Sequence, residues 1–240
     1  MKDKILRHPC LPARFSGNDA LFDRLSAVAE CLIEANRKFN LTAITDPDEI
    51  VSKHIVDSLI AADLVAEAAE DRPSSLIDIG SGAGFPSLPI AAALPHLNVT
   101  ALDSTAKKCT YMNETAKSAS IPHFRAISGR AEDLAVQKTH RDAYDFATAR
   151  AVANLPVLLE LCLPFVKVGG IFFALKGKNA PEEIKASENA LSKLGAKLEK
   201  TDEYRIPGDD SPRYLLTIRK ISPTPAGFPR HYSQISKKPL

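Results

Sequence analysis

The chain has 240 residues, of which 45% are hydrophobic and 25% charged, an ordinary balance for a globular protein with a substantial core. Its net charge of +2 permits a nucleic-acid partner but does not require one. The four cysteines show no C-x-x-C spacing, and no apolar run approaches the roughly eighteen residues of a membrane span. We therefore expect a cytoplasmic protein with free thiols, no bound metal and no membrane segment.

The first segment of the chain, residues 1–16, contains two prolines and is expected to be a loosely held arm. Ser16 or Asn18 can then cap a helix. Apolar residues recur at helical spacing from Leu21 onward and end near residue 40, which predicts one amphipathic helix over this stretch.

A second helix has a clearer start signal. Asp46 can be its N-cap, Pro47 suits the first helical position, and Glu49 completes a capping-box pattern. The helical pattern continues to about residue 70. We expect residues 1–72 to form a helical extension packed on the domain that follows.

Three polar residues on this second helix, His54, Asp57 and Ser58, have the side chains of a hydrolase triad. Residues on successive turns of one helix are expected to point outward side by side rather than converge on a substrate. The chain also has no nucleophile-elbow sequence. The pattern therefore favours a structural or RNA-facing polar patch over a triad.

From residue 75 onward, short apolar runs alternate with helical patterns, which predicts an α/β fold with a mostly parallel, doubly wound sheet. A turn sequence at residues 207–210 predicts an antiparallel hairpin at the end of the sheet. The seven expected strands are residues 75–79, 98–102, 123–127, 144–148, 170–175, 197–206 and 213–219, and the expected helices are residues 86–94, 105–118, 154–165 and 181–194.

The first of these strands runs directly into a glycine-rich turn. Gly80, Gly82 and Gly84 alternate in the sequence D-I-G-S-G-A-G-F-P, and a helix is expected to follow. Glycines at such a turn let the backbone N–H groups approach a nucleotide-like ligand. The dinucleotide fingerprint G-x-G-x-x-G is incomplete, because Phe85 stands where its last glycine would be.

This turn favours a cationic, phosphate-free ligand. Asp78 would repel a pyrophosphate, whereas Phe85 offers a wall for a flat or apolar group. Asp103, at the end of the second strand, can accept hydrogen bonds from both hydroxyls of a ribose, a feature that would serve NAD equally well. S-adenosylmethionine satisfies these conditions best. A parallel sheet closed by a hairpin is also the Rossmann-like architecture of class I S-adenosylmethionine-dependent methyltransferases, to which we assign residues 73–220.

Other charged residues are expected at the same edge of the sheet. Arg130, Ala131 and Glu132 follow the third strand, where an acidic side chain can accept from the exocyclic amine of an adenine. Arg150 ends the fourth strand and is the best candidate for contacting a nucleic acid, although a salt bridge to a carboxylate explains it equally well. Lys176, after the fifth strand, adds positive charge.

The remaining residues, 221–240, are rich in proline and carry no acidic side chain. They are expected to form an extended basic tail. Arg230, Lys237 and Lys238 in this tail are candidate RNA-binding residues, together with Lys176.

These motifs together resemble the RsmG (GidB) family of bacterial 16S ribosomal RNA guanine-N7 methyltransferases. The resemblance extends from about residue 36 to residue 240. The stretches that carry it are N-L-T at 40–42, K-H-I-V-D-S-L at 53–59, D-I-G-S-G-A-G-F-P at 78–86, L-D-S at 102–104, G-R-A-E at 129–132, A-R-A at 149–151, K-G at 176–177 and the ending from Phe228.

The resemblance implies an enzyme that methylates N7 of a guanine in the 16S RNA of the small ribosomal subunit. It implies that the S-adenosylmethionine site is lined by Gly80, Phe85, Ala131, Glu132 and Arg150, with Asp103 on the ribose. Because N7 carries a lone pair and no proton, no general base is needed, and Arg150 and Arg130 are the expected contacts to O6 or a phosphate. A monomer is the default expectation.

Two residues depart from the family pattern. Ser87 replaces a glycine usual after Phe-Pro, and His231 follows Arg230 where paired arginines are common. Two alternatives also remain open from the residues alone. One is an NAD-dependent oxidoreductase, although the last fingerprint glycine and an evident hydride-transfer residue are missing. The other is a non-catalytic RNA-binding protein on a methyltransferase fold.

Overall fold

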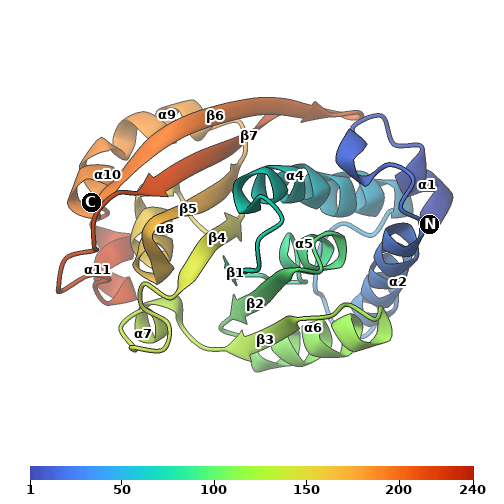
Figure 1. The fold of residues 1–240 in the computed structure, drawn as a ribbon, viewed down its shortest axis with the longest axis horizontal. Coiled ribbons are helices and arrows are strands. Elements are labelled where there is room, and N and C mark those ends of the chain that lie inside the picture. The colour runs from blue at the N-terminus through green and yellow to red at the C-terminus, as the bar shows by residue number, and fades with distance from the viewer.

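The computed structural model describes residues 1–240 and contains one seven-stranded sheet with the order β3-β2-β1-β4-β5-β7-β6 (Figure 1). The first five strands in sequence are parallel, whereas β7 pairs antiparallel with both β5 and β6. This confirms the predicted class I methyltransferase fold. The strands are β1 (Ser74–Ile79), β2 (Leu97–Asp103), β3 (Phe124–Ser128), β4 (Tyr144–Arg150), β5 (Val166–Lys176), β6 (Ala196–Ile206) and β7 (Asp209–Lys220).

The central strands are apolar because both faces of the sheet are covered. In β1, Leu76 belongs to the hydrophobic cluster on one face of the sheet, and its neighbour Ile77 belongs to the cluster on the other face. Successive side chains of a strand alternate between faces, so a doubly covered strand reads as a continuous apolar run. The sequence prediction of a buried parallel strand here is confirmed.

The helices form two layers around the sheet (Figure 1). The layer that contributes to the first cluster consists of α1 (Lys2–Leu6), α2 (Asp19–Asn36), α3 (Pro47–Ile50), α4 (Asp57–Ala69), α5 (Ser87–Ala93) and α6 (Ala106–Ser118). The opposite layer consists of α7 (Ala131–Leu134), α8 (Leu155–Cys162), α9 (Ala180–Ala186), α10 (Glu188–Lys193) and α11 (Tyr232–Lys237).

Both predicted helix starts near the N-terminus are confirmed. The Asn18 side chain accepts a hydrogen bond from the Leu21 amide (3.1 Å) and caps α2. The Asp46 carboxylate accepts from the amides of Asp48 and Glu49 (2.9 and 3.0 Å) and caps α3. Between α3 and α4 the helix continues through a π-helical segment, Val51–Val56. The predicted second helix is therefore one continuous helix in which the number of residues per turn changes in the middle.

Residues 1–16 are not a loosely held arm, and that expectation was wrong. They form α1 and a short 3₁₀ turn, Ala13–Phe15, and their apolar side chains Ile5 and Phe15 are buried in the first cluster. Proline content indicated irregular backbone, but two well-spaced apolar side chains are enough to dock a short segment on a hydrophobic surface.

Residues 221–240 are not an extended tail either. The segment ends in α11, whose Ile235 is fully buried in the second cluster. Arg141 donates to the carbonyls of Thr224 and Phe228 (2.8 Å each), which holds the approach to α11 against the domain. Separately, no helix of the structure is both long enough and apolar enough to cross a bilayer.

Replacing Ile5 by alanine is expected to lower the free energy of unfolding by roughly 2–5 kcal/mol, because the substitution leaves a cavity under α1. Chemical denaturation checks this value. The matched control is Lys4→Ala on the exposed face of the same helix, which removes only a surface ion pair to Asp48 and should change stability by less than about 1 kcal/mol. Equal effects of the two substitutions would show that the segment is not docked.

Candidate active site

The glycine turn after β1 has the backbone that its sequence predicted. Gly80, Gly82 and Gly84 all have positive φ angles, of 72°, 58° and 89°. At Gly80 a β-carbon would also lie only 2.6 Å from a methyl group of Val152, so both conformation and space require glycine there. The turn therefore brings bare backbone to the carboxyl end of the sheet, where open α/β sheets bind their ligands.

Asp103, at the end of β2, is tied directly to this turn. Its Oδ2 accepts from the Gly82 amide (2.9 Å), and its Oδ1 accepts from the Thr105 amide (2.9 Å). A carboxylate has about four acceptor positions, so both oxygens retain capacity for a ligand. The predicted pairing of a glycine turn with a second-strand acid is present in the structure.

A cavity of about 120 Å³ lies at the carboxyl ends of β1, β2 and β3. Four of the predicted cofactor residues, Gly80, Asp103, Ala131 and Glu132, line it, and so does Arg130, which forms an ion pair with Glu132 (3.2 Å). The other residues that line it are Ile79, Leu102, Ser104, Gly129, Val152, Leu161 and Tyr232. A carboxylate for ribose, a second carboxylate for an exocyclic amine and an apolar floor fit an adenosine, so the residues suit the predicted cofactor.

Asp78, another predicted cofactor residue, is fully buried inside the sheet. Its Oδ1 accepts from the Thr148 hydroxyl (2.9 Å), whereas its Oδ2 has no hydrogen-bond partner in the protein. Burial raises the pKa of this carboxyl, and the hydroxyls of Ser81, Thr148 and Ser87 partly offset the effect. An orphaned buried acceptor beside the glycine turn is consistent with a cationic ligand, because unpartnered buried oxygens are costly.

The Ser87 hydroxyl at the start of α5 is also buried and lacks a hydrogen-bond partner. It occupies the position at which the resemblance implied a glycine, and it lies close enough to the Asp78 carboxyl to influence its pKa. This departure therefore adds a polar group next to Asp78 rather than changing only the local helix geometry.

Phe85 lies away from the residues of the adenosine-sized cavity. Its ring is buried and stacks on His54, with ring centroids 4.7 Å apart and planes inclined by 14°. The Arg150 guanidinium lies over the same ring, 5.6 Å from its centre. Phe85 thus supports a cluster of charged side chains, and a direct contact between Phe85 and cofactor stays a prediction.

Arg150 is fixed by three acceptors from the π-helical segment and the start of α4. Its guanidinium donates to the Asp57 carboxylate (2.8 Å), to the Lys53 carbonyl (2.9 Å) and to Nδ1 of His54 (3.1 Å). The salt-bridge interpretation of Arg150 is confirmed, and its contact with a nucleic acid stays a prediction. Arg150 also lines a large cavity.

These contacts determine the tautomer of His54. A guanidinium can only donate, so Nδ1 must accept, and the ring proton therefore lies on Nε2 and is donated to the Thr42 hydroxyl (3.1 Å). Burial, reinforced by the positive charge of Arg150, lowers the pKa of His54 to about 4. His54 is thus a neutral imidazole at physiological pH.

Asp57 connects Arg150 to the C-terminal hairpin. Its side chain is 1% exposed, and its Oδ1 accepts from the Tyr204 hydroxyl (2.7 Å) and from Arg213 (3.0 Å). Arg213 in turn pairs with Asp209 (2.9 Å). Burial tends to lower the pKa of Arg213, but the charges of Asp57 and Asp209 outweigh it and raise that pKa. The result is an alternating row of two cations and two anions.

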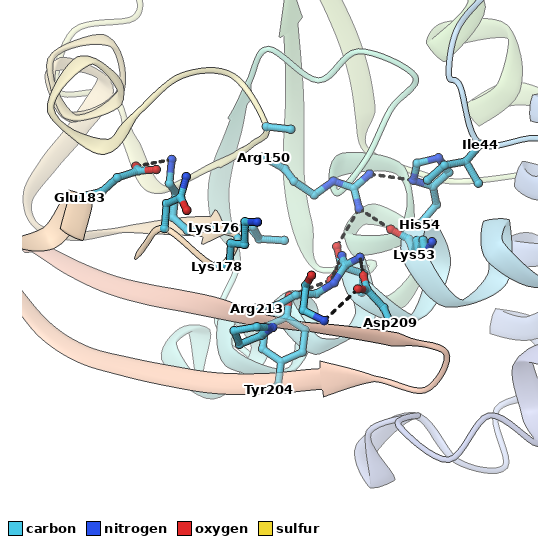
Figure 2. Close-up of a pocket in the computed structure, with 17 residues that line it drawn as sticks. Ile44, Lys53, His54, Arg150, Lys176, Lys178, Glu183, Tyr204, Asp209 and Arg213 are labelled. Carbon is cyan, nitrogen blue, oxygen red and sulfur yellow. Dashed lines mark hydrogen bonds and ion pairs between the residues drawn. The ribbon is translucent and has the colours of Figure 1, made fainter. Parts of the chain in front are cut away.

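This row forms one wall of a second cavity, of about 490 Å³, shown in Figure 2. Lys176 lies on the opposite side, where it pairs with Glu183 (2.7 Å) and donates to the Ala153 carbonyl (2.8 Å). The cavity is lined by Ile44, Lys53, His54, Asp57, Arg150, Ala151, Leu175, Lys176, Gly177, Lys178, Asn179, Glu183, Tyr204, Asp209, Ser211, Pro212 and Arg213.

The loop after β4 separates the two cavities. Arg150 and Ala151 line the larger cavity, whereas the next residue, Val152, lines the smaller one against Gly80. Ala151 has a positive φ of 57°, a conformation that costs energy for a residue with a side chain. A tight turn of this kind is needed for neighbouring residues to face different cavities.

The predicted RNA-binding residues are scattered. Lys176 lines the larger cavity, whereas Lys237 and Lys238 are exposed beside α11. Arg230 is occupied by a carboxylate, because its guanidinium and its amide donate to Glu160 at distances from 2.6 to 3.2 Å. That pair raises the pKa of Arg230 although burial opposes the rise.

Sequence reasoning missed the role of the His54 cluster. His54, Asp57 and Ser58 are all buried instead of pointing outward, and Tyr204 and Arg213 were not singled out. The available signal was the density of His, Asp and Lys in K-H-I-V-D-S-L, which is unusual for a helix that must bury one face.

The sheet order, the glycine turn with Asp103 and the cavity beside that turn define a class I S-adenosylmethionine-dependent methyltransferase. Solved structures share this fold. A 16S rRNA (adenine(1408)-N(1))-methyltransferase from Catenulisporales acidiphilia, with SAM, gives a TM-score of 0.51 at 16% identity over 68% of this chain and 92% of that one. Pyrococcus horikoshii TYW2 in complex with MeSAdo gives 0.53 at 18% identity over 68% of this chain and 62% of that one.

Sequence comparison identifies the family. The family model for rRNA small subunit methyltransferase G, GidB, matches residues 22–208. The "Ribosomal RNA small subunit methyltransferase G" of Acetivibrio thermocellus is 42% identical over 93% of this chain and 90% of that protein. The protein of the same name from Streptococcus pneumoniae serotype 19F is 44% identical over 88% of each chain. The chain belongs to the rRNA small subunit methyltransferase G family, as the resemblance had indicated.

His54 should make the protein less stable in mild acid. Its pKa is about 4 when folded and near 6.5 when unfolded, so the unfolded chain binds the extra proton between these values. The stability that depends on a neutral His54 is fully present above pH 6.5 and is lost as the pH falls toward 4. The loss amounts to about 3 kcal/mol in the free energy of unfolding.

Urea denaturation of the wild type and His54→Gln at several pH values tests this, because the difference between them isolates His54. The control is His123→Asn at an exposed histidine, which should keep the wild-type pH dependence. A parallel pH dependence of His54→Gln and wild type would contradict the buried neutral imidazole.

Proposed function

We propose that this protein transfers the methyl group of S-adenosylmethionine to N7 of a guanine in the 16S RNA of the small ribosomal subunit. The observation that carries the proposal is the pair of cavities on either side of the loop after β4, in a chain of the rRNA small subunit methyltransferase G family: the smaller is lined by Gly80 and Asp103, and the larger, charged one by Arg150. The family membership and the fold support the cofactor, and the larger cavity supports a base as the acceptor.

The smaller cavity would hold the cofactor's adenosine. Asp103 would accept from the ribose hydroxyls, and Glu132 from the adenine amine, while the amides near Gly82 stay fixed by Asp103 itself. Bound there, S-adenosylmethionine supplies an electrophilic methyl group on a sulfonium. Asp78 would offer its unpartnered Oδ2 beneath the turn, and a nearby cation would favour the ionised carboxylate, which suits such a ligand better than a pyrophosphate. An NAD-dependent oxidoreductase is not supported by these features or by the comparisons.

The larger cavity has the size and chemistry for a guanine. Its volume of about 490 Å³ lies within the usual range for small-ligand sites. Guanine presents N7 and O6 as acceptors on one edge and N–H donors on the other. Arg150 and Lys176 are cations for the acceptor edge, and Glu183 and Asp209 are carboxylates for the donor edge.

The reaction at N7 would rest on alignment rather than on proton transfer. The N7 lone pair is free at neutral pH, so no residue has to remove a proton. His54 agrees with this, since its single ring proton is committed to Thr42 and its pKa of about 4 makes it a fixed acceptor for Arg150. Arg150, held on Asp57, is thereby oriented toward the base, and preorganised orientation is where most of the rate gain would arise.

Binding of RNA would also use exposed lysines outside the two cavities. The exposed Lys237 and Lys238 offer sequence-independent attraction for phosphates, which weakens steeply with salt. The target base must leave the stack to enter the cavity, so a loop nucleotide is the expected substrate. An enzyme of this kind would work in the cytoplasm, and we propose that it does so as a monomer.

The test of the function is methyl transfer to defined RNA. The protein is incubated with labelled S-adenosylmethionine and either unmodified 16S RNA or isolated small subunits, and the modified nucleoside is identified. A second target RNA carries 7-deazaguanosine in place of the guanosine that receives the labelled methyl group. This RNA has a carbon in place of N7 and should accept no methyl group.

Label on an adenine, on protein or on a small molecule would contradict the assignment. Cofactor binding without any transfer to either substrate would instead favour a non-catalytic RNA-binding protein. Labelling of the 7-deazaguanosine RNA would show that another atom is the acceptor.

Asp103→Asn is expected to raise the KM for S-adenosylmethionine by roughly 10–100-fold with little change in kcat, because a charged acceptor for the ribose is lost before the chemical step. Initial rates at varied cofactor concentration measure this. The control is Asp133→Asn, an exposed acid at the same edge of the sheet, which should leave both constants unchanged. An unchanged KM in Asp103→Asn would remove Asp103 from the cofactor site.

A further inference from the structure

The C-terminal segment is held against the domain at a specific place. Glu160 in α8 is fully buried, and it is neutralised by Arg230 through the guanidinium and the backbone amide. A buried carboxylate is tolerated only when it is paired and hydrogen-bonded. Ile235 packs into the second cluster one turn later, so both ends of this short segment are fixed.

Between these anchors the chain places Tyr232 at the smaller cavity. Tyr232 begins α11 and lines that cavity together with Asp103 and Glu132. The residue keeps 36% of its surface exposed, so part of it is free to meet a ligand. The Arg230–Glu160 pair and the burial of Ile235 do not use this ring.

Arg130 fixes the orientation of the Tyr232 ring. Its guanidinium lies over the ring, 4.8 Å from the centre, and its Nε pairs with Glu132 (3.2 Å). A cation over an aromatic face is attractive, and the ion pair fixes Arg130 in turn. The three side chains form a connected part of the cavity wall.

We propose that Tyr232 is a cofactor-binding residue and that its ring packs on the adenine of S-adenosylmethionine. The inference rests on the proposed function for the identity of the ligand. Adenine presents a flat π-face, and an aromatic side chain of limited rotational freedom is a suitable partner for it. Arg130 then acts on the cofactor side, by holding Tyr232 and Glu132, rather than as a contact to the RNA.

This assignment gives residues 228–240 two separate tasks. Arg230 and Ile235 dock the segment, and Tyr232 completes the cofactor cavity, while Lys237 and Lys238 are exposed, do not line that cavity and stay available to phosphates. Cofactor affinity and RNA affinity should therefore respond to different residues of the same short segment.

The test is calorimetric binding of S-adenosylhomocysteine to the full chain with Tyr232→Ala and Tyr232→Phe. Loss of stacking is expected to weaken binding by roughly ten-fold in Tyr232→Ala. Tyr232→Phe keeps the ring and should bind as the wild type does. In methylation assays the same loss should appear in the KM for S-adenosylmethionine, with kcat and the KM for RNA unchanged.

Two controls separate the possible outcomes. Ser233→Ala, exposed on the same helix, reports on any general loosening of α11, and the double variant Lys237→Ala with Lys238→Ala should change only RNA binding. Wild-type affinity in Tyr232→Ala would overturn the inference and leave the proposed function standing. A wild-type protein that binds neither S-adenosylhomocysteine nor S-adenosylmethionine would overturn both.

Discussion

The buried carboxylate of Asp57 is the interaction on which the rest of the site depends. One side chain accepts from Arg150 of β4, from Tyr204 of β6 and from Arg213 of β7, and it belongs to a helix that precedes the sheet. Three parts of the chain are thus joined at one anion that has almost no contact with water. An unpaired charge buried there would lower the free energy of unfolding by several kcal/mol, which is comparable to the whole net stability of many domains. The partners are therefore required to be present together.

The positions of the two cavities follow from the order of the strands in the sheet. The smaller cavity lies over β1, β2 and β3, and the larger cavity is lined from the ends of β4, β5 and β7 and from the helical extension. The crossover between β1 and β4 is the point at which the strand order reverses, where α/β sheets open a crevice. The proposed cofactor and the proposed acceptor would lie on opposite sides of this point. The identity of the acceptor depends on the side chains that the helical extension and the hairpin contribute.

The sequence was sufficient where local chemistry decides the structure. Patterns of residues within a few positions of one another located all seven strands and predicted the glycine turn with its positive φ angles, and the expected pairing of that turn with Asp103 is present. It was insufficient where residues distant in the sequence determine which side chains are buried. His54 and Asp57 appeared solvent-exposed because an isolated helix does not reveal which face will be covered, and the π-helical segment changes the spacing on which such reasoning relies. The docking of α1 and of α11 depends in the same way on pockets built by other parts of the chain, such as the carboxylate of Glu160.

Because the residues around Asp57 are far apart in the sequence, their contacts form late in the synthesis and folding of the chain. Tyr204 and Arg213 follow Asp57 by 147 and 156 residues. Contacts so far apart close late, after the entropy of a long loop has been overcome. A chain growing on a ribosome therefore exposes Asp57 long before Tyr204 and Arg213 have been translated, and until β7 has emerged Arg150 is the one cation available to pair with it. The complete set of partners around Asp57 is in this sense a property of the finished polypeptide.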